Sequence, residues 1–159
     1  MWSGYQTAAV KETRLRTSEG LAGRDPMTDV LLIDDEDDSR AVVALVLERA
    51  GYRVTQASGW DDALTRTDGR NGIRLIVTDI VMPDHAGVEV FNRLRRRFGA
   101  IPVIVLSGYP RAMRLLDGVL DGVVEWLRKP SEADKLVHAV NAAVRAPAAD
   151  VTAGTVPGR

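Results

Sequence analysis

The 159-residue chain contains no cysteine and only two histidines, His85 and His138. The lack of cysteine excludes disulfides, a thiolate nucleophile and any metal site built on thiolates. Two histidines so far apart are too few for a histidine-rich metal site. The longest unbroken apolar run, Ala41–Leu47, is far shorter than the roughly 18 residues that a membrane-spanning helix needs. The N-terminus also lacks the apolar core of a secretory signal, so we expect a cytoplasmic protein with no membrane partner.

The chain also lacks a large excess of either positive or negative charge. The 21 basic and 22 acidic residues leave a net charge of −1, which argues against nucleic-acid binding through a general positive field. Lysine is scarce among the basic residues, because only Lys11, Lys129 and Lys135 are lysines and the others are arginines. One of these three lysines, Lys129, stands directly before a proline in the tripeptide Arg-Lys-Pro.

The length predicts one domain with tails. Residues 1–26 are mixed in charge and poor in large apolar side chains, and we expect a flexible N-terminal extension there. Met27 begins a run that looks like a natural start, so the preceding segment is either native or an added leader. Residues 147–159 are rich in Ala, Pro, Gly and Thr and predict a disordered tail. The folded domain is therefore expected over 27–146.

Within this domain, short apolar runs alternate with helical patterns. The predicted strands are Val30–Ile33, Arg53–Ala57, Ile73–Thr78, Ile101–Leu106 and Val123–Leu127. Four of them are apolar at nearly every position, as in a parallel sheet covered on both faces, whereas the alternation in Arg53–Ala57 is typical of an edge strand. The predicted helices lie between and after the strands, at about 38–50, 60–67, 88–98, 111–121 and 134–144.

Two helix starts carry capping patterns. Asp38 or Ser39 is expected to cap the first helix, and Ser131 with Asp134 forms a Ser-x-x-Asp capping pattern for the last. Five strands alternating with five helices predict a doubly wound α/β fold with helices on both faces of the sheet.

Polar residues follow the predicted strands. Asp34 and Asp35 follow the first strand, Asp79 the third, Ser107 the fourth, and the fifth leads to Lys129. In doubly wound folds ligands bind beyond the carboxyl ends of the strands, so these side chains are expected to meet at one edge of the sheet.

A cluster of three carboxylates needs a positive partner, because two of them about 4 Å apart repel by roughly 4 kcal/mol at an effective dielectric constant near 20. Lys129 supplies one positive charge, and an all-oxygen site without Cys or His favours Mg²⁺ over Zn²⁺. A carboxylate beside Mg²⁺, an ammonium and a hydroxyl is a plausible phosphoryl acceptor. The simpler alternative is that each aspartate is only a helix cap, which is the usual role of a single Asp after a strand.

Four segments in this order and spacing resemble the response regulator receiver family, the CheY-like domains of two-component signalling. They are Leu-Leu-Ile-Asp-Asp-Glu at 31–36, Thr-Asp-Ile-Val-Met-Pro-Asp-His-Ala-Gly at 78–87, Val-Leu-Ser-Gly at 105–108 and Trp-Leu-Arg-Lys-Pro at 126–130. The resemblance covers about residues 28–146. It implies a flavodoxin-like, five-stranded parallel sheet in the order 2-1-3-4-5 with five helices.

The resemblance also implies roles for the residues of the cluster. Asp79 would accept the phosphoryl group, and Lys129 and Ser107 would contact its oxygens. Asp35, Asp79 and the backbone carbonyl of Val81 would ligate Mg²⁺, with Asp34 acting largely through water. Trp126 occupies the position of the switch aromatic, where Tyr or Phe is commoner, so it either switches or only caps the sheet edge. The apolar Val81 also predicts an altered lifetime of the aspartyl phosphate.

By resemblance, the phosphoryl donor would be a histidine kinase or a histidine phosphotransfer protein. The short segments outside the domain predict a stand-alone receiver that signals to a protein partner. The surface expected to contact that partner is formed by the fourth helix, fifth strand and fifth helix (110–120, 123–127 and 135–144), and it could also serve a phosphorylation-dependent homodimer. Two alternatives stay open: an interaction module that is not phosphorylated, and a Mg²⁺-dependent phosphatase of the haloacid-dehalogenase type.

Overall fold

The computed structural model describes residues 28–69, 72–81, 87–117, 119–120 and 122–146. The predicted N-terminal extension, the predicted tail and His85 lie outside these residues. The strands are β1 (Asp29–Ile33), β2 (Arg53–Ala57), β3 (Ile73–Thr78), β4 (Val103–Ser107) and β5 (Val123–Arg128). The helices are α2 (Asp37–Arg49), α3 (Trp60–Arg66), α4 (Gly87–Phe98), α5 (Pro110–Leu116) and α6 (Ala133–Arg145).

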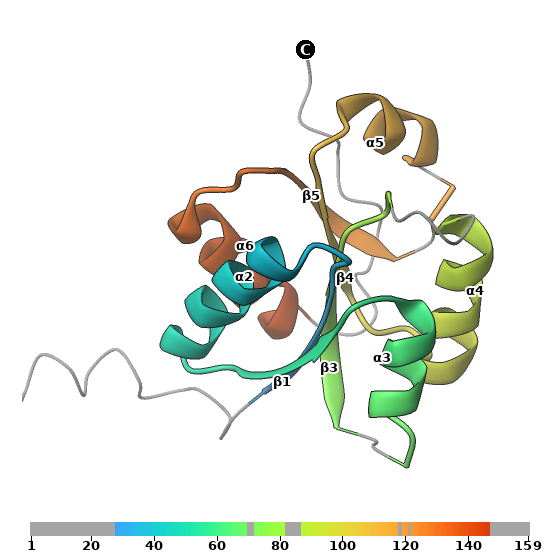
Figure 1. Ribbon diagram of the computed structural model, residues 1–159, viewed down its shortest axis with the longest axis horizontal. Coiled ribbons are helices and arrows are strands. Elements are labelled where there is room, and N and C mark those ends of the chain that lie inside the picture. The colour runs from blue at the N-terminus through green and yellow to red at the C-terminus, as the bar shows by residue number, and fades with distance from the viewer. Residues whose placement is uncertain (1–27, 70–71, 82–86, 118, 121, 147–159) are drawn as a thin grey trace, which may run out of the picture.

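The five strands form one parallel sheet in the order β2-β1-β3-β4-β5, which confirms the predicted fold class and strand order. Helices α2 and α6 cover one face of the sheet, and α3, α4 and α5 lie on the other side (Figure 1). Strand Arg53–Ala57 lies at an edge of the sheet, as the alternation in its sequence predicted, and it is partly exposed. No helix in the described part of the chain has the length and apolar character to cross a bilayer.

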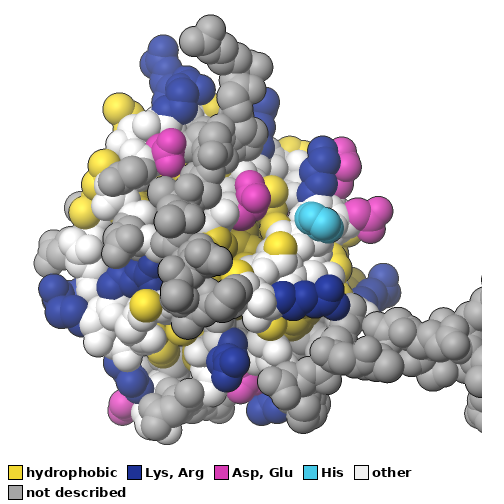
Figure 2. Space-filling model, turned by 180° about the vertical axis from the view of Figure 1, so that it is seen from behind, with side chains coloured by type: hydrophobic (Ala, Val, Ile, Leu, Met, Phe, Trp, Pro, Cys, Tyr) yellow, Lys and Arg dark blue, Asp and Glu magenta, His cyan; other side chains and the backbone are white. Residues whose placement is uncertain are grey.

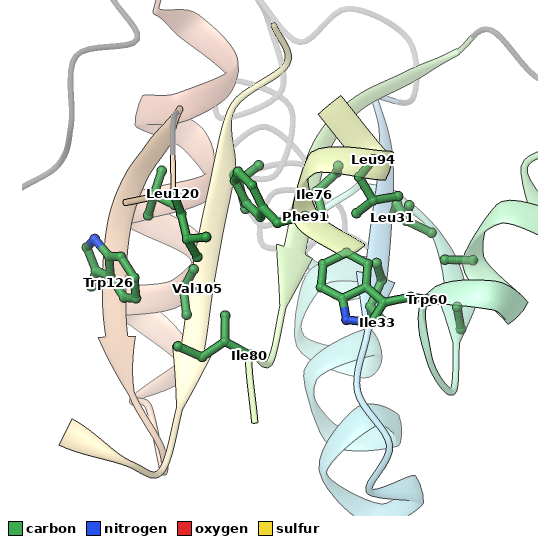
Figure 3. Packing of buried hydrophobic residues seen from close by; sticks show 14 of the residues in the cluster. Leu31, Ile33, Trp60, Ile76, Ile80, Phe91, Leu94, Val105, Leu120 and Trp126 are labelled. Carbon is green, nitrogen blue, oxygen red and sulfur yellow. The ribbon is translucent and has the colours of Figure 1, made fainter. Parts of the chain in front are cut away.

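Two hydrophobic layers hold the helices against the sheet, because successive side chains of a strand point to opposite faces. On β1, Leu31 and Ile33 pack in the layer under α3, α4 and α5, whereas Val30 and Leu32 pack in the layer under α2 and α6. Figure 3 shows the first layer, with Trp60 beside Ile33 and Trp126 beside Leu120. All strands point the same way, so this packing fixes their carboxyl ends at one edge.

The first helix starts earlier than predicted. Helix α2 begins at Asp37, with Glu36 at the cap position and no side-chain cap bond, so the prediction that Asp38 or Ser39 caps it is wrong. Ser39 instead lies in the first turn, where its hydroxyl donates to Asp34. The capping pattern predicted that the Ser39 hydroxyl bonds a backbone N–H of the helix, but it bonds the Asp34 carboxylate instead.

The capping pattern predicted for the last helix is also wrong. Helix α6 begins at Ala133, which puts Glu132 rather than Ser131 at the cap position, without a side-chain cap bond. The Ser131 hydroxyl contacts the Glu132 carbonyl oxygen at 3.4 Å. The pattern is one residue out of register, because a capping box needs its acidic residue three positions after the cap.

Two further boundaries differ. Strand β4 starts at Val103 rather than Ile101, since Pro102 has no N–H to donate to a neighbouring strand. Helix α5 ends at Leu116, five residues before the predicted end, because the backbone of Asp117 is extended with ψ 126°. The helix starts at Pro110, which suits a first helical turn.

Candidate phosphoryl-acceptor site

The parallel strands bring Asp34, Asp35, Asp79 and Lys129 together at the carboxyl edge of the sheet. Asp34 follows β1, and its backbone N–H donates to Ala57 O of neighbouring β2 at 3.1 Å. Asp79 follows β3, and its N–H donates to Ile33 O at 2.9 Å. These bonds continue the sheet past the ends of the strands and hold both aspartates at one edge.

Lys129 joins the two central carboxylates. Its Nζ lies 2.5 Å from Asp34 Oδ2 and 3.0 Å from Asp79 Oδ2. Asp34 is 1% exposed and Asp79 is 7% exposed, so both interactions are largely shielded from water. Burial, the largest single influence, lowers the pKa of Lys129, but its hydrogen bonds and ion pairs with the two aspartates outweigh burial and raise that pKa above 10.5. Lys129 is therefore fully charged at neutral pH.

Asp35 completes an acidic cluster with Asp34 and Asp79. Each residue offers a carboxylate oxygen, and these oxygens lie within 4.8 Å of one another. Two such charges repel by about 3.5 kcal/mol at an effective dielectric constant of about 20. Three carboxylates against the single ammonium of Lys129 leave a formal charge of −2. An all-oxygen donor set with this deficit fits a hard divalent cation such as Mg²⁺.

Backbone N–H groups bind the Oδ1 atoms of Asp34 and Asp79, the carboxylate oxygens that Lys129 does not contact. Glu36 N donates to Asp34 Oδ1 at 3.0 Å, and Val81 N donates to Asp79 Oδ1 at 3.0 Å. Val81 itself is 37% exposed. Each carboxylate thus has one oxygen held by the chain that follows it and one oxygen held by Lys129, which fixes how both side chains face the edge.

Ser107 lies at the same edge but faces its own loop. It is fully buried, and its hydroxyl accepts a bond from Tyr109 N at 3.1 Å. Its carbonyl accepts a bond from Lys129 N at 2.9 Å, which ties the ends of β4 and β5 together. Among the described residues, its hydroxyl forms no hydrogen bond with the acidic cluster. A role on a phosphoryl group would require the hydroxyl to turn.

Trp126 lies one layer deeper, in the hydrophobic core. It pairs with Val105 across the sheet and is 1% exposed, with Leu120 nearby (Figure 3). The indole therefore occupies an inward position in this structure. The movement of Trp126 as a switch residue stays a prediction.

Two neighbours of the site were not recognised as part of it from the sequence. Ser39 Oγ donates to Asp34 Oδ2 at 2.8 Å, and Arg40 Nη1 donates to the Asp34 carbonyl at 2.7 Å. Arg40 also pairs with the exposed carboxylate of Asp37. The one available clue was position, since the first turn of the helix after β1 has to pass the Asp34 side chain.

The comparisons with known proteins show the family of the chain. A family model described as the response regulator receiver domain matches residues 30–141, and the chain belongs to this family. Receiver domains bind Mg²⁺ at an acidic pocket, and this chain has an acidic cluster at the carboxyl edge of its sheet.

Solved receivers share the fold. A response regulator receiver domain protein from Clostridium thermocellum is 28% identical, with a TM-score of 0.66 over 74% of this chain and 94% of that one. The chemotaxis protein CheY4 of Vibrio cholerae is 26% identical, with a TM-score of 0.65 over 74% of this chain and 98% of that one.

The curated relatives are longer proteins. The uncharacterized transcriptional regulatory protein YkoG of Bacillus subtilis is 30% identical over 116 residues, which are 73% of this chain and 50% of YkoG. The transcriptional regulatory protein FixJ of Bradyrhizobium diazoefficiens is 29% identical over 73% of this chain and 56% of FixJ. The chain thus spans about half the length of these relatives.

Proposed function

We propose that Asp79 is a phosphoryl acceptor whose modification switches the domain between two states. The observation that carries this proposal is the contact of one half-buried ammonium, Lys129, with the buried carboxylates of Asp34 and Asp79 beside the third carboxylate of Asp35. A phosphohistidine of a histidine kinase or a phosphotransfer protein would donate the group: its N–P bond breaks as an O–P bond forms at the Asp79 carboxylate.

The acidic cluster would hold Mg²⁺ directly through Asp35, Asp79 and the carbonyl of Val81, with Asp34 acting largely through water. When bound, the cation would neutralise negative charge on the phosphoryl oxygens. Lys129 would contact the same oxygens with its ammonium, a compact point charge that Arg does not reproduce. Both charges would act in a shielded site, where electrostatic stabilisation is larger than in water.

A surface next to the site suits the phosphoryl donor. A groove of about 440 Å³ lies between α2 and α6, and its lining includes Lys129, Pro130 and Val42. Val42 is 62% exposed, and Leu45, one turn further along α2, is 48% exposed. A donor that covers these apolar side chains would lie beside the edge of the sheet that carries Asp79.

The response to phosphorylation would start at Ser107. Its hydroxyl would leave Tyr109 N for the phosphoryl oxygens and draw the loop after β4 inward. Contacts that exist only in the modified state shift a two-state equilibrium. Trp126, which pairs with Val105 of β4 in the core, would report or transmit the movement.

The surface of α5, β5 and α6 is the proposed contact for a downstream protein. Tyr109, Leu115 and Val119 are 59%, 77% and 54% exposed around α5. Between β5 and α6, Figure 2 shows a hydrophobic patch beside His138, the cyan side chain, with charges of both signs around it. A protein partner or a second copy would bury such a surface, and the mixed charges give little attraction for nucleic acid. The stand-alone state and the cytoplasmic location stay predictions.

The proposal is tested by incubating the protein with acetyl phosphate, with and without Mg²⁺, and measuring the intact mass. We expect a single phosphoryl adduct that requires Mg²⁺ and disappears in Asp79→Asn. Asp37→Asn removes an exposed carboxylate outside the cluster and should keep the adduct. A wild-type protein that forms no adduct would instead support the interaction module, and turnover of many donor equivalents without an adduct would support a phosphatase.

A further inference from the structure

One oxygen of Asp34 has two side-chain donors. Asp34 Oδ2 accepts from Lys129 Nζ at 2.5 Å and from Ser39 Oγ at 2.8 Å, while Oδ1 accepts from Glu36 N at 3.0 Å. Asp34 is 1% exposed, so water has little access to replace a donor that leaves. A buried carboxylate that loses its partner is costly.

Phosphoryl transfer as proposed above asks Lys129 to leave this oxygen. Its ammonium is shared by Asp34 and Asp79, and its new contacts would be with phosphoryl oxygens at Asp79. Asp34 would then lose its cation at the moment when the site gains negative charge. The hydroxyl of Ser39 is the side-chain donor that stays on Asp34 Oδ2.

The backbone around Ser39 suits a donor that stays in place. Ser39 lies in the first turn of α2, where Arg40 N donates to Glu36 O at 2.9 Å. The next side chain, Arg40, donates to the Asp34 carbonyl and to Asp37. These bonds connect the helix start to the Asp34 backbone without passing through Lys129, so movement of Lys129 leaves them intact.

We propose that Ser39 is a positioning residue that holds the Asp34 carboxylate so that Lys129 can transfer its ammonium to the phosphoryl group. The inference rests on the proposed function for the movement of Lys129. The sharing of one Asp34 oxygen by Ser39 and Lys129 rests on the geometry alone. The two parts are therefore tested separately.

The first test measures binding of beryllium trifluoride, a phosphoryl mimic, at saturating Mg²⁺ by intrinsic tryptophan fluorescence. We expect Ser39→Ala to weaken binding of the mimic about tenfold, the size of one lost hydrogen bond to a charged group. Ser39→Thr keeps the hydroxyl and should restore binding. Ser58→Ala is the matched control, because it removes a hydroxyl that lies 3.2 Å from another carboxylate, Asp62 Oδ2, and should bind as the wild type does.

The Mg²⁺ affinity measured without the mimic distinguishes the proposed positioning role of Ser39 from a role in forming the Mg²⁺ site itself. We expect Ser39→Ala to change it less than about threefold, because Lys129 then stays on Asp34. An equal loss of Mg²⁺ and mimic affinity, or no loss of either, would overturn the proposal.

The second test is a double-mutant cycle of Ser39→Ala and Lys129→Met. Stability is measured for each variant as the midpoint of urea unfolding without metal. The double variant should lose more stability than the sum of the two single losses, because among the described residues the Asp34 carboxylate then keeps only the backbone donor from Glu36. Additive losses would refute the shared oxygen, whatever the protein does with phosphoryl donors. If the cycle shows coupling but the wild type binds no mimic, the shared oxygen is supported, whereas the proposed function and the movement of Lys129 are both refuted.

Discussion

Lys129→Met should destabilise the protein in the absence of metal. The variant leaves Asp34 and Asp79, which are 1% and 7% exposed, without their shared cation. Removing one partner of a buried ion pair costs about 3–5 kcal/mol, and we expect about 3 kcal/mol because the Lys129 side chain remains 17% exposed. Urea unfolding followed by tryptophan fluorescence measures the loss. The control Lys135→Met breaks an exposed pair with Glu132 and should cost less than about 0.5 kcal/mol.

Mg²⁺ should then stabilise Lys129→Met more than it stabilises the wild type. Without the ammonium the formal charge of the cluster falls from −2 to −3, so a divalent cation relieves more repulsion. Binding to the folded state alone raises the free energy of unfolding as ligand concentration rises. A variant whose midpoint rises no more with Mg²⁺ than that of the wild type would refute the charge argument for this site.

The stability difference between wild type and Lys129→Met also has a predicted pH dependence. The pKa of Lys129 in the folded protein is raised above its ordinary value of 10.5. A raised pKa means that the contribution to stability is complete below pH 10.5 and disappears as the pH rises through the folded-state pKa. The two unfolding midpoints should therefore converge above pH 10.5. A constant difference there would mean that the ammonium charge is not what stabilises the wild type.

Glycine replacements and the buried indole give two further predictions. Gly122→Ala should lower the free energy of unfolding by at least about 1–2 kcal/mol, since Gly122 has φ +80° and a Cβ there overlaps the Arg95 guanidinium. Gly99 has φ +70° but open space around it, so Gly99→Ala should lose only the free energy that the strained backbone costs. Gly59 has an extended φ of 177° and open space, so Gly59→Ala should lose neither contribution. Equal losses of unfolding free energy in the three variants would contradict this order. Trp126→Ala should cost about 3–5 kcal/mol in urea unfolding, as for other buried aromatic side chains, and a loss below 1 kcal/mol would show that the indole is not packed in solution.

The sheet and the acidic cluster were predictable because both depend on patterns that sequence shows directly. A parallel sheet needs apolar runs buried on both faces, and the residue after each run must fall at its carboxyl edge. Asp34, Asp79 and Lys129 were located by this rule, and the structure brings them within hydrogen-bond distance. The scarcity of lysine gave a further indication, because an ammonium at position 129 contrasts with the arginines used elsewhere.

Side-chain direction was not predictable in the same way. Whether Ser39 caps the helix or bonds Asp34 depends on whether α2 begins at residue 37 or three residues later, at residue 40. Both starts satisfy the local preferences of a helix N-terminus, and the choice is made by tertiary contacts that a local pattern does not contain. The bond from Tyr109 N to the Ser107 hydroxyl is a case of the same kind, because it depends on how the loop after β4 turns.

Stability and switching oppose each other at this site. Lys129 offsets the repulsion within the acidic cluster when no ligand is bound, yet the proposed function requires that ammonium to leave Asp34. A second donor on Asp34 Oδ2 lowers the cost of that movement, whereas a site held by Lys129 alone would resist it. The negative charge left over in the cluster has the opposite effect, since it makes the unmodified site favour a divalent cation. The neutral composition of the chain conceals this local deficit, which the strand order creates by gathering three aspartates and one lysine at the same edge.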